Sequence, residues 1–172
     1  PEPPIENVTD SLPRHPTKEY DTRSLADIQY FVVHHTAVPA HIGPVPIARY
    51  QVQERDWPGI GYHFVVMDNG VIYQTNRLET ISYHARSANP TSVGIALSGN
   101  FTETGPTRAQ VKGAAGLLAY LMQLLRLPGG SIKGHKDFVQ TQCPGDQWDS
   151  GLHWRETLLK EIISVFTTLK YL

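Results

Sequence analysis

The chain has 172 residues, of which 40% are hydrophobic and 18% are charged, and its formal net charge is −1. This length suits one domain with a sizeable buried core. The nearly balanced charge gives no indication of a nucleic-acid partner or an anionic membrane surface. No apolar run approaches the roughly 20 residues of a membrane-spanning helix. The single cysteine excludes an intramolecular disulfide, so the composition predicts a globular domain held together by packing.

Residues 1–27 are rich in proline and polar side chains, which predicts an extended arm that packs on the domain or leads into it. Their first part, PEPPIENVTDSLPRHP, lacks the basic segment followed by an apolar one that marks a signal peptide. We expect residues 28–172 to form a single folded domain.

Four segments predict strands. Residues 30–34 (YFVVH) are β-branched and aromatic, as in a buried strand. Residues 62–67 and 71–74 flank Asp-Asn-Gly and predict a hairpin, in which Asn69-Gly70 suits a tight primed turn. Residues 93–97 (VGIAL) predict a further central strand.

Helical patterns alternate with these strands. A helix is expected over residues 46–55 and another over residues 154–170. Between them, Thr107 and Gln110 form a capping box that begins the clearest helix. Its apolar stripe consists of Val111, Ala114, Ala115, Leu118, Leu121, Met122 and Leu125. Strands interspersed with amphipathic helices predict an α/β domain whose sheet is covered by helices.

Histidines and the lone cysteine are the candidate chemical groups. His34 and His35 end the first strand, and because neighbouring strand residues point to opposite faces, only one of them can enter a given site. His135 and Cys143 lie eight residues apart in the loop that follows the long helix. Two imidazoles and a thiolate suit a catalytic zinc ion that keeps its fourth position for water. From spacing alone, Cys143 remains a zinc ligand, a redox group or a small packed hydrophobe.

Four sequence segments together resemble one family. They are residues 32–37 (VVHHTA), 61–66 (GYHFVV), 92–101 (SVGIALSGNF), and GHKD at 134–137 with CPG at 143–145. In order and spacing they are similar to the zinc-dependent N-acetylmuramoyl-L-alanine amidases, a family that includes phage endolysin amidases and peptidoglycan recognition proteins. The resemblance covers about residues 29–154.

The resemblance implies a single α/β domain with a central mixed β-sheet flanked by helices and a zinc groove on one face. It maps the ligands of one Zn²⁺ per chain onto His34, His135 and Cys143. The resemblance thus identifies His34 rather than His35 as the ligand. His35 is then expected to be a packed residue or one that supports a ligand. Members of the family that only bind peptidoglycan tend to lose the thiol, so the presence of Cys143 favours catalysis.

The implied reaction is hydrolysis of the amide bond between the lactyl group of N-acetylmuramic acid and the L-alanine of the stem peptide. A zinc ion would polarise the carbonyl group and activate water. Tyr62 matches a tyrosine that faces the metal and would donate to the oxyanion. Thr141 stands where several phage relatives carry a lysine. It would hydrogen-bond the oxyanion or the zinc-bound water. Ala96 replaces a glutamate of the muropeptide-recycling branch, so no carboxylate base is apparent.

Three further residues, His63, His84 and Asn89, match groove positions that could bind the substrate, although structural hydrogen bonds would explain each of them as well. The expected partner is peptidoglycan or a muropeptide, bound by a monomer that acts on the cell wall as a secreted, envelope or phage-encoded protein. The alternative function is a peptidoglycan-binding recognition module without turnover.

Overall fold

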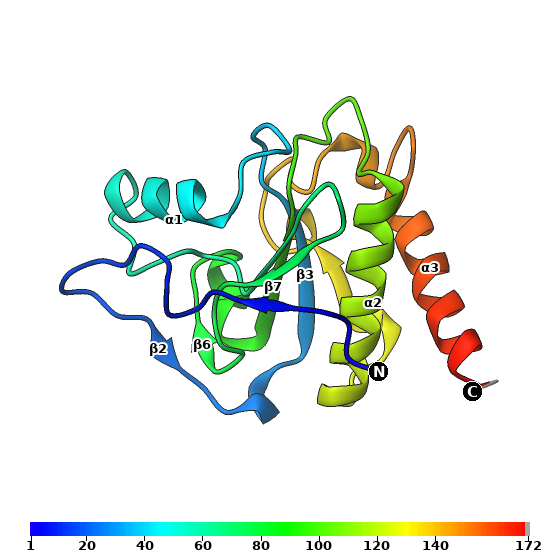
Figure 1. The fold of residues 1–172 in the computed structure, drawn as a ribbon, viewed down its shortest axis with the longest axis horizontal. Helices are drawn as coiled ribbons and strands as arrows, with labels where there is room; N and C mark the ends of the chain where they lie inside the picture. Colours follow the sequence, from blue (N-terminus) through cyan, green and yellow to red (C-terminus); the bar gives the residue numbers. More distant parts are fainter. Residues whose placement is uncertain (171–172) are drawn as a thin grey trace.

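A six-stranded mixed sheet runs through the centre of the computed structural model, which describes residues 1–170 (Figure 1). Across the sheet the order is β1 (Glu6–Asn7), β5 (Ile72–Gln74), β4 (Phe64–Val66), β7 (Ser92–Leu97), β3 (Tyr30–His35) and β8 (Ile132–Gly134). Within this sheet only β4 and β5 pair in antiparallel fashion. A small second sheet pairs β2 (Asp21–Thr22) with β6 (Thr80–Ile81).

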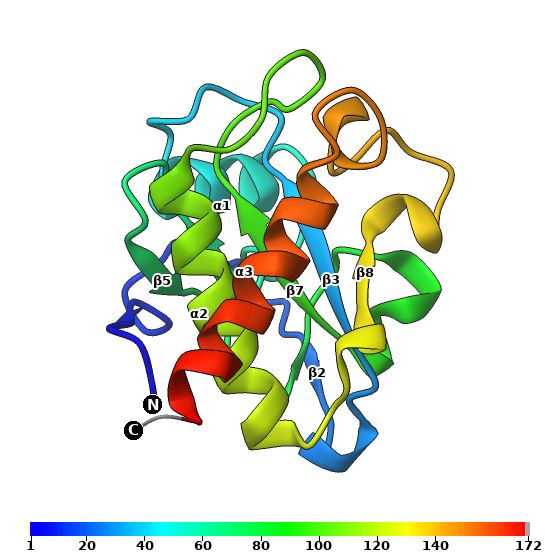
Figure 2. The ribbon, with the colours of Figure 1, turned by 90° about the vertical axis from the view of Figure 1, so that its right-hand side faces the viewer.

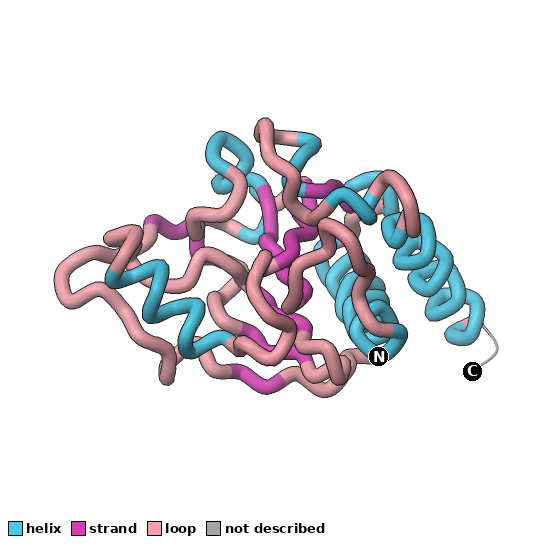
Figure 3. Tube along the Cα trace, turned by 90° about the horizontal axis from the view of Figure 1, so that it is seen from above, coloured by secondary structure: helices cyan, strands magenta, loops and turns pink. Residues whose placement is uncertain are grey.

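Helices cover both faces of the sheet. Helices α2 (Arg108–Leu125) and α3 (Trp154–Leu169) lie side by side on one face (Figure 2), whereas α1 (Pro44–Gln53) lies on the other side (Figure 3). The strand alternation follows this division, because Phe31 and Val33 join the core beneath α2 and α3 while Val32 packs in a cluster on the opposite face. The expected α/β fold with a mixed central sheet is therefore confirmed. No helix within residues 1–170 is long and apolar enough to cross a membrane.

The predicted helices are all present, with small shifts at their ends. Helix α2 begins after Thr107, whose side chain accepts a hydrogen bond from the Gln110 N–H, so the expected capping box is confirmed. Helix α1 begins at Pro44, two residues earlier than expected, and its first turn accommodates both Pro44 and Pro46 because the first N–H groups of a helix have no partner within it. The short strand β8 was not predicted, since three residues are too few for a periodic pattern.

The hairpin between β4 and β5 is confirmed, but its turn differs from the expected one. A type I′ turn needs positive φ at both central residues and a type II′ turn needs it at the first, whereas of Asn69 and Gly70 only the second, Gly70, has one, at 88°. The Gly70 N–H donates to the Met67 carbonyl, and Met67 N–H donates to the Val71 carbonyl, which closes a three-residue loop. A Cβ atom at Gly70 would lie 2.8 Å from a backbone oxygen at the start of α2, so only glycine fits.

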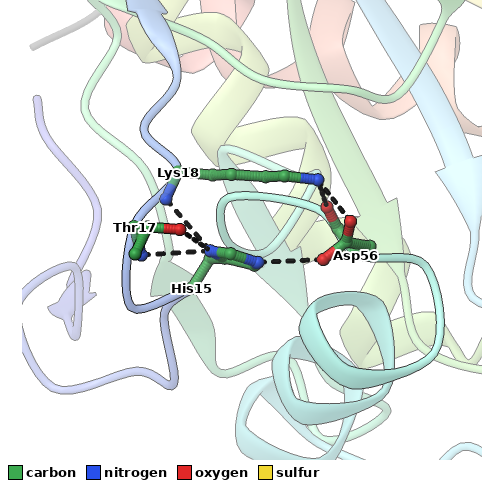
Figure 4. A network of polar contacts seen from close by, with 4 residues as sticks. All are labelled: His15, Thr17, Lys18 and Asp56. Atoms are coloured by element: carbon green, nitrogen blue, oxygen red, sulfur yellow. Dashed lines mark hydrogen bonds and ion pairs between the residues drawn. The ribbon is translucent and has the colours of Figure 1, made fainter.

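The N-terminal arm is tied to the domain at several points. Strand β1 pairs with β5, and β2 pairs with β6. Between them, His15 donates from Nε2 to Asp56 Oδ1 at 2.9 Å, while Lys18 pairs with the other carboxylate oxygen (Figure 4). The Arg23 guanidinium donates to the carbonyls of Leu78 and Asn89. These contacts hold the arm against β5, β6 and the loop that follows α1.

Gln110 joins α2 to two strands through a buried side chain. Its Nε2 donates to the carbonyls of Val66 (3.0 Å) and Ser98 (2.9 Å), and 1% of the residue is exposed. Because Gln110→Leu leaves buried carbonyls without this donor, we expect the free energy of unfolding to fall by about 1–3 kcal/mol. Urea denaturation measures this change. Gln123→Leu, on the exposed face of the same helix, should change it by less than about 0.5 kcal/mol, and equal effects of the two variants would refute the assignment.

Candidate metal centre

The register of two parallel strands places two histidines side by side. In the pairing of β3 with β8, Val33 is opposite Gly134, so the next residues, His34 and His135, meet at the carboxyl ends of the strands. The centroids of their rings are 4.5 Å apart. His34 shares the face of Val32, whereas His35 points to the opposite face, where its Nδ1 accepts a hydrogen bond from the Phe101 N–H.

Cys143 reaches this position because its loop folds back on the segment after β8. The Lys136 N–H donates to the Cys143 carbonyl at 3.0 Å, and the Thr141 hydroxyl accepts a hydrogen bond from the Cys143 N–H at 3.3 Å. The thiol thus lies with its Sγ 3.6 Å from His34 Nδ1. Residues 109 positions apart in the sequence are therefore in direct contact.

The donor atoms of His34, His135 and Cys143 all lie within 4.8 Å of one another. A zinc ion with a Zn–S distance of about 2.3 Å and a Zn–N distance of about 2.0–2.1 Å in tetrahedral geometry requires an S···N separation of about 3.6 Å. The separation between Cys143 Sγ and His34 Nδ1 matches this value. Two nitrogens and one sulfur are also a donor set that zinc accepts, so these residues fit the metal.

Burial sets the protonation of the three residues. It lowers the pKa of His34 well below its ordinary value, and the nearby rings of His84 and His135 lower it further. Burial also lowers the pKa of His135 to about 4, so both imidazoles are neutral at pH 7, as ligands must be. The pKa of the Cys143 thiol is raised to about 12 by burial. Binding of a metal ion to Cys143 therefore releases a proton.

The three residues line a cavity of about 800 Å³. Tyr62, Thr141 and His84 line the same cavity, and the Tyr62 ring centroid is 5.2 Å from that of His34. Burial, with a smaller effect of Cys143, raises the pKa of Tyr62, so its hydroxyl keeps its proton. The rest of the wall is largely apolar and includes Val38, Ile42, Ile47, Tyr50, Trp57 and Tyr83.

Two residues expected in the groove lie behind it. His63 has no exposed surface, and its ring accepts a hydrogen bond from the Gly94 N–H and contacts the Thr80 carbonyl. The Asn89 side chain accepts hydrogen bonds from the backbone N–H groups of His84 and Ala85. Sequence reasoning missed the aromatic wall residues Trp57 and Tyr83, because they lie in irregular segments that carry no periodic signal.

Comparisons with known proteins agree with this geometry. The family model described as N-acetylmuramoyl-L-alanine amidase matches residues 24–146. Peptidoglycan recognition protein 1 of Bos taurus is 32% identical over 134 residues, which cover 70% of this chain and 68% of that protein. The N-acetylmuramoyl-L-alanine amidase of Homo sapiens is 33% identical over 129 residues, which cover 68% of this chain and 22% of that protein.

Among solved structures, the endolysin N-acetylmuramoyl-L-alanine amidase LysCS from Clostridium intestinale URNW superposes with a TM-score of 0.70 at 32% sequence identity. The superposition covers 84% of this chain and 88% of that one. The similarity therefore extends over most of the domain that holds the candidate metal centre.

Acid should destabilise the metal-free protein through its buried histidines. Burial lowers the pKa of His63 to about 3, below the ordinary value of 6.5. The stabilisation from His63 is thus complete above pH 6.5 and is lost as the pH falls towards 3, by about 1.4 kcal/mol per pH unit. Urea denaturation with chelator at pH 7, 6 and 5 should show a falling free energy of unfolding. His63→Asn should make this decline shallower, and a free energy independent of pH would contradict the expectation.

Proposed function

The chain belongs to the N-acetylmuramoyl-L-alanine amidase family, and we propose that it hydrolyses the amide bond between the lactyl group of N-acetylmuramic acid and the L-alanine of the stem peptide. The observation that carries the proposal is the convergence of His34, His135 and Cys143 in the wall of a large cavity. We propose that they hold one Zn²⁺ per chain. When bound, the ion would polarise the scissile carbonyl group and activate water.

Tyr62 is the proposed donor to the oxyanion that develops when water adds to the carbonyl carbon. Tyr62 lines the cavity with its ring beside that of His34, and its hydroxyl stays protonated at neutral pH, so it can donate a hydrogen bond and does not act as a base. Thr141 is the proposed second donor. Its oxygen accepts from the Cys143 N–H, which leaves its O–H available to donate to a substrate group in the cavity that Thr141 lines.

The side chains that line the cavity limit which groups can transfer protons during the reaction. None of the described residues that line it is an aspartate or a glutamate, and Ala96 packs in an apolar cluster with α1. The proposal therefore assigns proton transfer to no carboxylate. In the overall reaction the hydroxide part of water joins the carbonyl carbon and a proton joins the released amine of L-alanine.

Substrate contacts in the proposal come from the cavity wall. We propose that His84, which lines the cavity although it is largely buried, contacts the substrate, and we assign His63 and Asn89 a supporting place behind it. Residues 28–172 would be the catalytic domain and residues 1–27 the arm that braces it. The protein would act as a monomer on peptidoglycan of the cell wall, whether secreted, in the envelope or phage-encoded.

A peptidoglycan-binding module without turnover is the second candidate, because one of the similar proteins is named a peptidoglycan recognition protein. The thiol next to two histidine nitrogens favours hydrolysis over binding alone. Mass analysis of products separates the two functions, since binding releases no stem peptide.

Removal of the thiol tests the proposed zinc site. Cys143→Ala should lower the zinc content from about one ion per chain to near zero and abolish release of stem peptide from purified peptidoglycan, because the site loses its anionic ligand. Elemental analysis and mass spectrometry of muropeptides measure both effects. His41→Ala, an exposed histidine outside the cluster, should retain zinc and activity. A zinc-free wild-type protein with full activity would end the proposal.

Removal of one hydroxyl tests the role of Tyr62. Tyr62→Phe should reduce kcat by about 10²–10³-fold while the zinc content stays unchanged, because an oxyanion donor is lost and no ligand is touched. Tyr120→Phe, on α2 and away from the cavity, serves as the control. Steady-state kinetics on a defined muropeptide measure the change, and activity within twofold of wild type would remove Tyr62 from the mechanism.

A further inference from the structure

A chain of hydrogen bonds leads away from the metal centre through His84. His34 Nε2 lies 2.9 Å from His84 Nδ1, and His84 Nε2 lies 3.2 Å from Ser92 Oγ. The Ser92 hydroxyl in turn donates to the Ala88 carbonyl at 2.7 Å. All four residues are buried, with His34 at 1% and Ser92 at 0% exposure.

The direction of the chain is fixed at its far end. A carbonyl oxygen only accepts, so the Ser92 proton points to Ala88 and the Ser92 oxygen must accept from His84 Nε2–H. A neutral His84 then has an unprotonated Nδ1, which accepts from His34 Nε2–H. His34 is thereby left with a lone pair on Nδ1, the nitrogen that lies 3.6 Å from Cys143 Sγ.

We propose that His84 is a positioning residue that fixes the tautomer and ring orientation of His34, so that Nδ1 is presented to the metal. The inference rests on the proposed zinc site. Metal-binding histidines generally donate their other ring N–H to a carboxylate, a carbonyl or water. Here a neutral imidazole accepts this hydrogen bond, so the ligand is oriented without burying a further charge.

The packing around His84 holds its ring in one place. A Cβ atom at Gly94 would lie 2.8 Å from Cγ and Nδ1 of His84, so the ring lies directly against the bare backbone of β7. The Asn89 side chain accepts from the His84 N–H at 3.0 Å, and Arg23 of the arm binds the Asn89 carbonyl. The His63 ring packs edge-on against His84 with centroids 5.7 Å apart. Through these contacts, the residues that hold the proposed ligand His34 in position reach as far as Arg23 in the N-terminal arm.

The tautomer can be measured directly on the metal-free wild-type protein. Long-range ¹H–¹⁵N NMR correlations of ¹⁵N-labelled histidine rings distinguish a protonated Nε2 from a protonated Nδ1. The proposal predicts that His34 and His84 are both protonated at Nε2 at pH 7.5. Protonation of His34 at Nδ1 would overturn it, and this readout needs neither zinc nor activity.

If His84 orients His34 for the metal, its replacement should weaken zinc binding, and the zinc affinity of His84 variants tests this. His84→Leu should weaken zinc binding by about 10–100-fold, measured by competition with a chromophoric chelator. His84→Asn should recover most of this loss, because its side-chain oxygen lies close to the position of Nδ1 and accepts the same hydrogen bond. His41→Asn is the control, an exposed histidine outside the cluster, and its zinc affinity should be that of wild type.

The outcomes separate the inference from the function it rests on. A wild-type protein that binds no zinc defeats the proposed function, and the tautomer measurement still decides the role of His84. If wild type binds zinc and His84→Leu binds it equally well, the positioning role is wrong. Should His84→Leu fail to fold, Ser92→Ala gives the second readout, since removal of the acceptor for His84 Nε2–H should shift the His34 tautomer equilibrium and weaken zinc binding by several-fold. An unchanged tautomer and affinity in that variant would contradict the proposal.

Discussion

The parallel pairing of β3 with β8 is the constraint on which the rest of the centre depends. It sets Val33 opposite Gly134, so that two histidines leave their strands together at one edge of the sheet. Parallel strands that end at the same edge of a sheet place residues side by side that are far apart in the sequence. The loop that returns Cys143 is held there by the bond from the Lys136 N–H to the Cys143 carbonyl and by the Thr141 hydroxyl, which accepts from the Cys143 N–H. A slip of one residue in this register would send His34 to the side of α2 and α3.

Several features of the fold followed from the sequence because local physics determines them. The cap at Thr107 and the apolar stripe of α2 depend on neighbours within one or two turns, and both are found as expected. The buried strand at residues 30–35 is likewise marked by its β-branched residues. The family and its fold could be inferred because four separate segments kept their order and spacing.

Other features depend on tertiary contacts and left no local signal. The turn at Asn69-Gly70 is shaped by the start of α2, which leaves no room for a side chain at Gly70. Strand β8 is defined by its pairing with β3 rather than by its three residues. For His84, the sequence could not distinguish a residue at the cavity surface from one bonded to His34, because that depends on a contact across 50 positions. Strand parity alone also could not select between His34 and His35.

X-ray absorption spectroscopy at the zinc edge of the zinc-loaded protein tests the central claim most directly. The account predicts one sulfur at about 2.3 Å and nitrogen or oxygen donors at about 2.0–2.1 Å that include two imidazoles. The fourth coordination position would be occupied by water or hydroxide, as hydrolysis requires. A spectrum without a sulfur contribution, or one whose four donors all come from protein side chains, would contradict it.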